Sequence, residues 1–203
     1  VPKAVEDAMY TVLTEQYANP NAQYPFGQEM RRSVEDWRAM IAKAVGCEAN
    51  QLFFTSCGTE GDNWAIRAAC WQNRHVGRHI VTTAVEHHAV LHPMQKLEAK
   101  GFEVTYLKPD REGNITVDAL KKALRPDTIL VSVMMVNNET GAVMPIADMV
   151  RATRRLSPLA LFHTDAVQGF LKVPFRARTL GADMISVSAH KIHAAKGTGA
   201  LYI

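Results

Sequence analysis

The sequence predicts an α/β fold, a three-layer sandwich in which helices cover both faces of a mainly parallel, mixed sheet. Two observations lead to this prediction. Segments with helical apolar spacing alternate with short strand-like segments along the chain, as in βαβ units. The segment 129–136 (ILVSVMMV) is apolar without alternation, which is typical of a strand buried on both faces. No repeat, low-complexity run or linker divides the 203 residues, so we expect one domain over 1–203.

The elements follow in order along the chain. The first residues resemble a helix already under way, and a longer helix is expected over 28–45, ended by Gly46. The apolar face of that helix repeats every three or four residues, through Met30, Val34, Trp37, Ile41 and Ala44. Further helices are expected at 60–73, 88–100, 117–124 and 146–155. Strands are expected at 51–55, 79–83, 103–107, 129–136, 159–164, 183–188 and 199–203.

The composition excludes several classes of protein. The net charge is +3 with acids and bases interspersed, which favours neither a nucleic-acid nor a membrane partner. Three cysteines without paired spacing (Cys47, Cys57 and Cys70) argue against a disulfide framework and predict a reducing, cytoplasmic location. No apolar run reaches the ~18 residues that a membrane span needs, and the start does not resemble a signal peptide. We expect both ends to be cut from a longer chain, because an element is under way at each.

Polar clusters follow five of the predicted strands, at the point where each strand ends. In sheets of this kind, ligands bind beyond the carboxyl ends of the strands. We therefore expect the clusters to meet at one crevice, although they are far apart in sequence. They are Ser56–Thr59, Glu86–His88, Asn137–Glu139, Asp165–Gln168 and Ser188–Lys191.

Two of these clusters could bind the charged groups of a ligand, one an anion and the other a cation. Gly58 and Thr59 open a helix, where backbone N–H groups and the helix dipole favour an anion. The alternative is an ordinary helix cap made by Ser56 or Thr59. Asp165 follows an apolar strand, where a buried carboxylate needs a cation such as a protonated pyridine nitrogen. A helix cap is again the alternative.

The segment 188–199 (SAHKIHAAKGTG) is the most specific of the five. Lys191 follows a strand directly and could form a Schiff base with an aldehyde cofactor, while Ser188 and His190 could hold a phosphate. The alternative for any lysine is a solvated surface charge. Lys196 lies beside a glycine in an expected turn, so we favour Lys191.

The remaining candidates are histidines and an asparagine. His87 could stack on a flat ring, or simply begin a helix. His88 and His92 have the i, i+4 spacing of a metal pair, but no further ligand is evident, so a metal site is not favoured. Asn138 could donate to a ring hydroxyl oxygen, or belong to an ordinary Asn-Gly turn.

Taken together, the segments resemble the fold-type-I pyridoxal phosphate (PLP) enzymes, and most closely the cysteine desulfurases of the class V aminotransferase group. The resemblance runs from Asn19 to Ile203 and is carried by FTSCGTEGDN, AVEHHAVL, MMVNNETGAVMPI, FHTDAVQGFLKVPF and SVSAHKIHAAKGTGALYI. It implies that 1–203 is a PLP-binding large domain. It also implies catalytic roles for Lys191, which bonds the cofactor, and His87, which stacks on it. The implied cofactor-binding residues are Gly58, Thr59, His87, Asn138, Asp165, Gln168, Ser188, His190 and Lys191.

The resemblance implies removal of sulfur from L-cysteine, giving L-alanine and an enzyme persulfide that supplies iron–sulfur assembly or thiolation. It also implies a homodimer and a sulfur-acceptor protein as partners. Three features depart from the family pattern. The family's nucleophilic cysteine lies well downstream of the lysine, whereas all three cysteines here precede Lys191. The family's small C-terminal domain and first strand have no counterpart, and Tyr24 replaces a frequent histidine.

Other functions remain open from the residues alone. A selenocysteine lyase or another class V relative would use the same cofactor residues. A protein of another class, a non-catalytic cofactor-binding or dimerisation module, would bind PLP without releasing sulfide.

Overall fold

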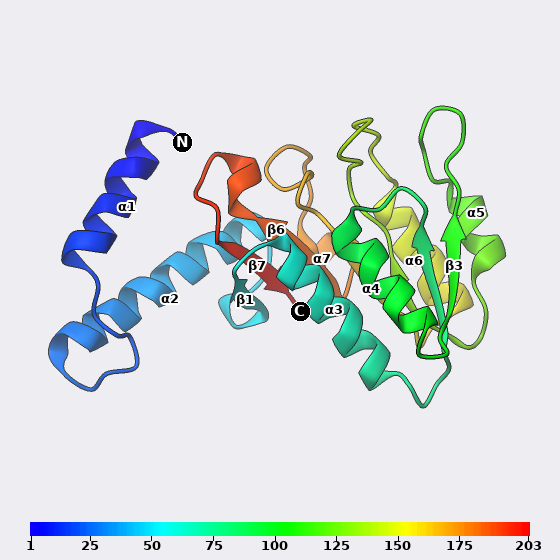
Figure 1. Ribbon diagram of the computed structural model, residues 1–203, viewed down its shortest axis with the longest axis horizontal. Helices are drawn as coiled ribbons and strands as arrows, with labels where there is room; N and C mark the ends of the chain where they lie inside the picture. The colour runs from blue at the N-terminus through cyan, green and yellow to red at the C-terminus, as the bar shows by residue number, and fades with distance from the viewer.

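The computed structural model describes all residues from Val1 to Ile203. It confirms the predicted α/β sandwich, with one mixed, mostly parallel seven-stranded sheet between layers of helices (Figure 1). The helices are α1 (Lys3–Glu15), α2 (Pro25–Val45), α3 (Gly58–Gln72), α4 (His88–Glu98), α5 (Val117–Ala123), α6 (Ile146–Leu156) and α7 (Ala177–Leu180). The strands are β1 (Leu52–Thr55), β2 (His79–Thr83), β3 (Glu103–Leu107), β4 (Thr128–Ser132), β5 (Leu161–Asp165), β6 (Met184–Ser188) and β7 (Gly199–Tyr202). Two short 3₁₀ helices, Ala49–Gln51 and Ala189–Ile192, complete the fold.

The strand order is β1-β7-β6-β5-β4-β2-β3. Strands β2 to β6 pair in parallel, whereas β7 runs antiparallel to both β6 and β1. The parallel strands therefore end at one edge of the sheet, where parallel α/β folds place their ligands. The sheet is mixed because β7 is antiparallel to β6, with Val187 opposite Ala200.

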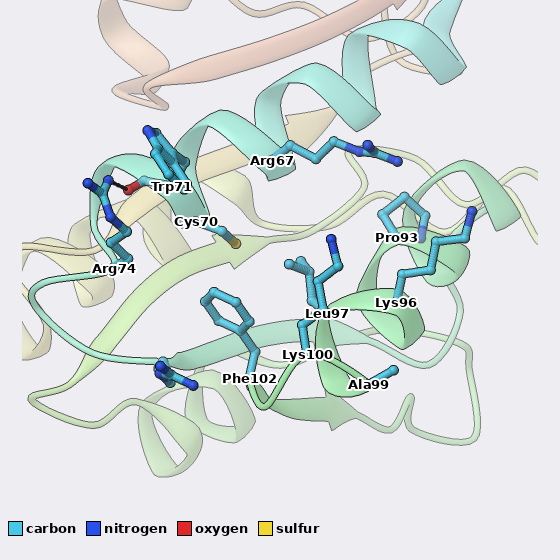
Figure 2. Close-up of a pocket in the computed structure, with 11 residues that line it drawn as sticks. Arg67, Cys70, Trp71, Arg74, Pro93, Lys96, Leu97, Ala99, Lys100 and Phe102 are labelled. Atoms are coloured by element: carbon cyan, nitrogen blue, oxygen red, sulfur yellow. Dashed lines mark hydrogen bonds between the residues drawn. The ribbon is translucent and has the colours of Figure 1, made fainter.

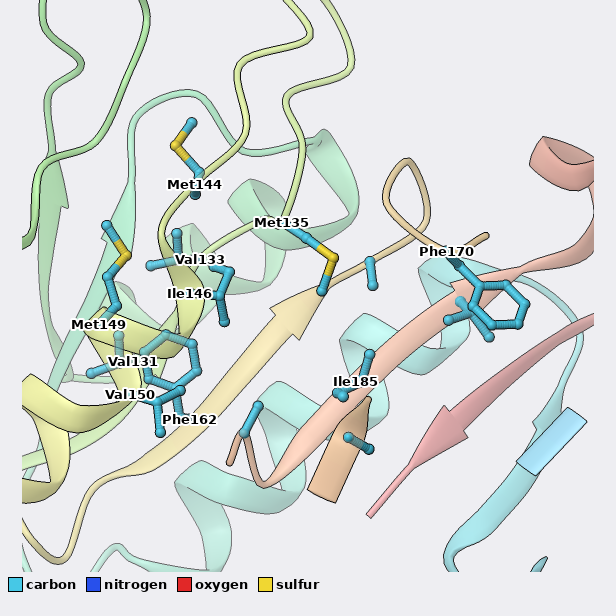
Figure 3. Packing of buried hydrophobic residues seen from close by; sticks show 14 of the residues in the cluster. Val131, Val133, Met135, Met144, Ile146, Met149, Val150, Phe162, Phe170 and Ile185 are labelled. Atoms are coloured by element: carbon cyan, nitrogen blue, oxygen red, sulfur yellow. The ribbon is translucent and has the colours of Figure 1, made fainter. Parts of the chain in front are cut away.

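Each face of the sheet has its own apolar core. On one face, α3 and α4 cover a cluster that includes Ile66, Val90 and Leu130. On the other face, α6, α7 and the end of α2 cover a larger cluster. Figure 3 shows part of the larger cluster, in which Phe162 from β5 lies near Met149 and Val150 from α6, while Ile185 extends the cluster along β6. Burial on both faces explains why β4 has no polar alternation.

The two N-terminal helices extend away from the sheet (Figure 1). Helix α2 ends at Gly46, as its sequence predicts, and this residue adopts the left-handed conformation (φ 83°) of a helix C-cap. Helix α1 has no buried residue. None of the helices is both long and apolar enough to cross a membrane.

The predicted strand 129–136 is too long, because β4 ends at Ser132. Val81 is opposite Val131, so β2, which ends at Thr83, offers no strand partner from Met134 onward. Instead, the backbone N–H of Met134 donates to the carboxyl group of Glu86 at 2.9 Å. On the other side, Met135 N–H still donates to Asp165 O at 2.8 Å. The segment beyond Ser132 thus stays buried and attached to β5 while leaving the regular sheet.

Candidate active site

The polar clusters meet as predicted, in a cavity of about 200 Å³ at the carboxyl edge of the parallel strands. Every residue that the sequence proposed for cofactor binding lines this cavity. The full set is Gly58, Thr59, His87, Asn138, Asp165, Gln168, Ser188, His190 and Lys191.

A larger hollow of about 740 Å³ lies elsewhere, between α3 and α4 (Figure 2). Its walls combine apolar side chains such as Trp71 and Phe102 with basic ones such as Arg67 and Lys96. No carboxylate or histidine lines it, and burial raises the pKa of its one thiol, Cys70, to about 12. The smaller cavity, by contrast, is lined by carboxyl groups and histidines, the side chains commonly used in general acid–base chemistry, so it is the candidate active site.

One end of the cavity is the start of α3. The predicted caps Ser56 and Thr59 are wrong, because the N-cap is Cys57 and no side chain caps the helix. Ser56 instead donates from its N–H (2.6 Å) and hydroxyl (2.8 Å) to Glu60. The first-turn N–H groups therefore keep no side-chain partner and suit an anion. A side chain at Gly58 would meet Val167 Cγ2 at 2.5 Å, so glycine lets this helix end approach the β5 loop.

Asp165, the last residue of β5, also lines the cavity and is only 6% exposed. Its Oδ1 accepts a hydrogen bond from Val167 N–H at 2.9 Å, which closes a turn rather than capping a helix. Burial, and then the charge of Asp62, raise the pKa of Asp165 to about 8. A cation bound beside it would reverse this shift, because an opposite charge favours the carboxylate. Asp165 therefore suits a protonated ring nitrogen.

Lys191 lies in the short 3₁₀ helix that follows β6, and it makes no ion pair or hydrogen bond. Ser188, 2% exposed, brings its hydroxyl to 2.9 Å from His190 Nδ1. Lys196 does not line the cavity. The arrangement places one free amine among side chains able to bind a phosphate.

His87 begins α4, and its Nδ1 accepts a hydrogen bond from Ala89 N–H at 3.1 Å. In the neutral ring the proton is then on Nε2. The alternative prediction of a helix-start histidine is therefore correct, and it is compatible with a role at the cavity. The rings of His88 and His92 stack at 5.0 Å. No three His, Cys, Asp or Glu side chains form a group suited to a metal ion.

Asn138 and Gln168 line the cavity with their amides partly engaged. Asn138 Nδ2 donates to Glu139 at 2.7 Å, and Gln168 Oε1 accepts from Lys172 at 2.9 Å. The turn after β4 is held by Asn137 instead, whose Oδ1 accepts from the N–H groups of Glu139 and Thr140. The amide NH₂ of Gln168 remains available to a ligand.

Sequence reasoning missed the polar groups buried beneath the cavity. Asp62, 1% exposed, lines the cavity from α3 and lies 3.5 Å from His163 Nε2. His163 is fully buried in β5, two residues before Asp165. The available signal was a single acid on the apolar face of α3, close to Ala65 and Ile66. Such an acid is costly to bury without a partner.

Comparison with known proteins identifies the family of this chain. The family described as aminotransferase class-V matches residues 1–203. The chain belongs to this class-V family. A cysteine desulfurase IscS of Dictyoglomus turgidum is 47% identical over 201 residues, which cover 99% of this chain and 50% of that protein. The class-V chain thus spans about half the length of the curated relatives it matches.

Two solved structures share the class-V fold over the whole chain. A NifS-like protein superposes with a TM-score of 0.97 at 39% identity, covering 100% of this chain and 56% of that one. SspA, solved in complex with cysteine, superposes with a TM-score of 0.95 at 34% identity, covering 100% and 58%. The predicted resemblance to class-V cysteine desulfurases is therefore confirmed.

Proposed function

We propose that residues 1–203 are the PLP-binding large domain of a cysteine desulfurase. The observation that carries the proposal is the cavity itself, which joins a free lysine, a buried carboxylate and an uncapped helix start. These three features match the aldehyde, the ring nitrogen and the phosphate of PLP. The names of the relatives and the cysteine bound to SspA support the substrate class, L-cysteine.

The residues divide by the part of PLP that each would hold. Gly58 and Thr59, at the α3 start, would bind the phosphate, together with the side chains of Ser188 and His190. Asp165 would hold the ring nitrogen in its protonated state. Gln168 and Asn138 would donate to the ring hydroxyl oxygen. When bound, PLP supplies an electron sink for the substrate α-carbon.

Two side chains are placed to move protons. Lys191 would hold the cofactor through its amine, and as a free amine it would be placed to accept and return a proton. His87 would lie against the cofactor ring and present its Nε2 proton, because Nδ1 is held by Ala89 N–H. Both residues line the cavity, as this division of labour requires.

The sulfur-accepting cysteine is not evident among the three in this chain. Cys47 and Cys70 are outside the cavity, and burial raises the pKa of both thiols, which keeps them protonated. Cys57 lines the cavity, but it precedes the helix start that would bind the phosphate. We propose that a cysteine from the rest of the protein accepts the sulfur and passes it to an acceptor protein. All three cysteines are free, as a reducing compartment would keep them, and a cytoplasmic location stays a prediction.

The test is a visible absorption spectrum after PLP is added and the excess removed. The protein is expected to keep a band from the lysine-bound cofactor, and Lys191→Ala to lose it. Lys196→Ala is the matched control and should keep the band, because Lys196 lies outside the cavity. A wild-type protein without a band, measured on the full-length protein, would overturn the proposal.

The second candidate is a cofactor-binding module without catalysis, because no suitable cysteine is evident here. Sulfide release from L-cysteine by the full-length protein with a thiol reductant distinguishes the two. Release supports the desulfurase. A protein that holds PLP but releases no sulfide would favour the module.

A further inference from the structure

The floor of the candidate active site is rich in buried acids. Asp62, Glu86 and Asp165 are 1%, 5% and 6% exposed. No lysine or arginine is buried anywhere in the chain to offset them. Two histidines are buried, but His79 is the first residue of β2, at the opposite end of the sheet, where its ring is hydrogen-bonded to Thr128 and Thr105. His163 is therefore the one buried base beside these carboxyl groups.

His163 is held between the two neighbouring strands. Its Nδ1 lies 2.9 Å from Ser132 Oγ on β4, and its Nε2 lies 3.0 Å from Ser186 Oγ on β6. Hydroxyl groups can both donate and accept, so they satisfy either charge state of the ring. The two serines therefore fix the position of the ring, whereas its charge state depends on the nearby acidic side chains.

Asp62 is the acid nearest to the ring. Its Oδ1 lies 3.5 Å from His163 Nε2 and has no hydrogen-bond partner, although it is fully enclosed. A buried carboxylate without a partner is strongly disfavoured unless a positive charge compensates it. An imidazolium at His163 would supply that charge at short range.

We propose that His163 and Asp62 form a buried ion pair, and that this pair positions the charge at Asp165, the residue that would face the cofactor's ring nitrogen. The inference rests on the proposed function, and it adds two positioning residues to the site. The His163 proton offsets the charge of Asp62, so that Asp165 can carry its own negative charge nearby.

The physical reason is repulsion among the carboxylates. The charge of Asp62 contributes, after burial, to the raised pKa of Asp165. Burial is also the main cause of the raised pKa of Glu86, and the charges of Asp165 and Asp62 add to it. From β4 and β6 the ring meets only the uncharged Ser132 and Ser186, and Asp62 is the one acid within ion-pair distance of it. Without the His163 proton, Asp165 would be driven neutral and could not hold a protonated ring nitrogen.

The test is a double-mutant cycle on PLP affinity, measured by titrating the cofactor-free full-length protein. His163→Gln keeps a donor and an acceptor for the two serines but removes the charge, and it should weaken binding about tenfold or more, one pKa unit at Asp165 being a factor of ten. Asp62→Asn alone should bind at least as tightly as the wild type. The double variant should recover to within about threefold of Asp62→Asn, because the charge that needed compensation is gone.

Two results would overturn the inference. One is a double variant as weak as His163→Gln, which would indicate a role in packing alone. The other is a His163→Gln variant with wild-type affinity. Thermal unfolding of all four proteins shows whether each variant is folded.

A measurement without cofactor separates this inference from the proposed function. The ¹⁵N chemical shifts of the His163 ring report its charge in the cofactor-free protein. A doubly protonated ring at pH 7.5 that becomes neutral in Asp62→Asn supports the ion pair even if PLP does not bind. A ring that is neutral in both proteins would overturn the ion pair, whatever the absorption spectrum shows.

Discussion

Glu86 illustrates how a single side chain can connect the sheet to the site. Its Oε1 accepts from Thr83 Oγ1 at 2.8 Å and from Met134 N–H at 2.9 Å, whereas Oε2 has no partner. Burial raises the pKa of Glu86 to about 8, against the opposing effect of these hydrogen bonds. The residue therefore joins the end of β2 to the segment after β4 as a neutral acid at neutral pH.

This raised pKa predicts a pH-dependent stability. Between the ordinary carboxyl pKa near 4.5 and about 8, the folded state holds a proton that the unfolded state has lost, so stability falls as pH rises through this window. Glu86→Gln removes the effect while keeping the acceptor. We expect little difference from the wild type at pH 5 and a more stable variant at pH 9, on the order of a few kcal/mol, by urea unfolding.

The matched control for that measurement is Glu29→Gln, on the exposed side of α2, which retains Glu86 and should follow the stability of the wild type at both pH values. Equal stability of Glu86→Gln and the wild type at both pH values would contradict the prediction. It would mean that Glu86 is ionised in the folded protein.

At the scale of elements, the ends of helices and strands determine the geometry of the site. Helix α3 begins without a side-chain cap and α4 begins at His87, so two helix starts are directed toward the ligand region. Strand β4 stops where Glu86 replaces its neighbour. Farther away, Gly46 ends α2 in the left-handed conformation, against the segment that precedes α7.

Gly46→Ala should destabilise the protein at this helix end. A left-handed alanine costs about 1–2 kcal/mol, and its Cβ would meet Arg176 Cβ at 2.7 Å, which forces a shift. Gly141→Ala is the control, since Gly141 has a similar φ of 75° but open space around it. Urea unfolding should show a larger loss for Gly46→Ala. Equal losses would indicate that the Arg176 contact relaxes without cost.

At the scale of the whole molecule, the sheet ends in an edge strand with exposed aromatic side chains. On β1, Phe53 and Phe54 are 39% and 36% exposed, and Phe53 contacts Trp64 of α3 edge to face at 5.8 Å. Unpaired edges and exposed apolar patches are usually covered in the native assembly. These exposed aromatic side chains suit a contact with a second copy of the chain, and the homodimer implied by the resemblance stays a prediction.

Light scattering on the full-length protein tests the dimer. We expect twice the mass of one chain at micromolar concentration, maintained on tenfold dilution. A monomer throughout that range would contradict the proposal.

The sequence by itself determined the fold class, the order of the elements and most of the polar residues around the cavity, although not Asp62. These depend on local signals: apolar periodicity marks helices and strands, and polar residues just after strands mark the ligand edge of a parallel sheet. For that reason Lys191, Asp165 and Gly58 could be proposed before any coordinates.

Only the tertiary structure decided which polar groups lie close enough to interact electrostatically. Asp62 and His163 are far apart along the chain, and the parallel packing of β5 beneath α3 brings them to 3.5 Å. The tertiary structure also showed that Asn137, rather than Asn138, holds the turn after β4, and that β4 ends at Ser132. Burial and electrostatic coupling depend on neighbours that are distant in sequence, so no local pattern could have predicted them.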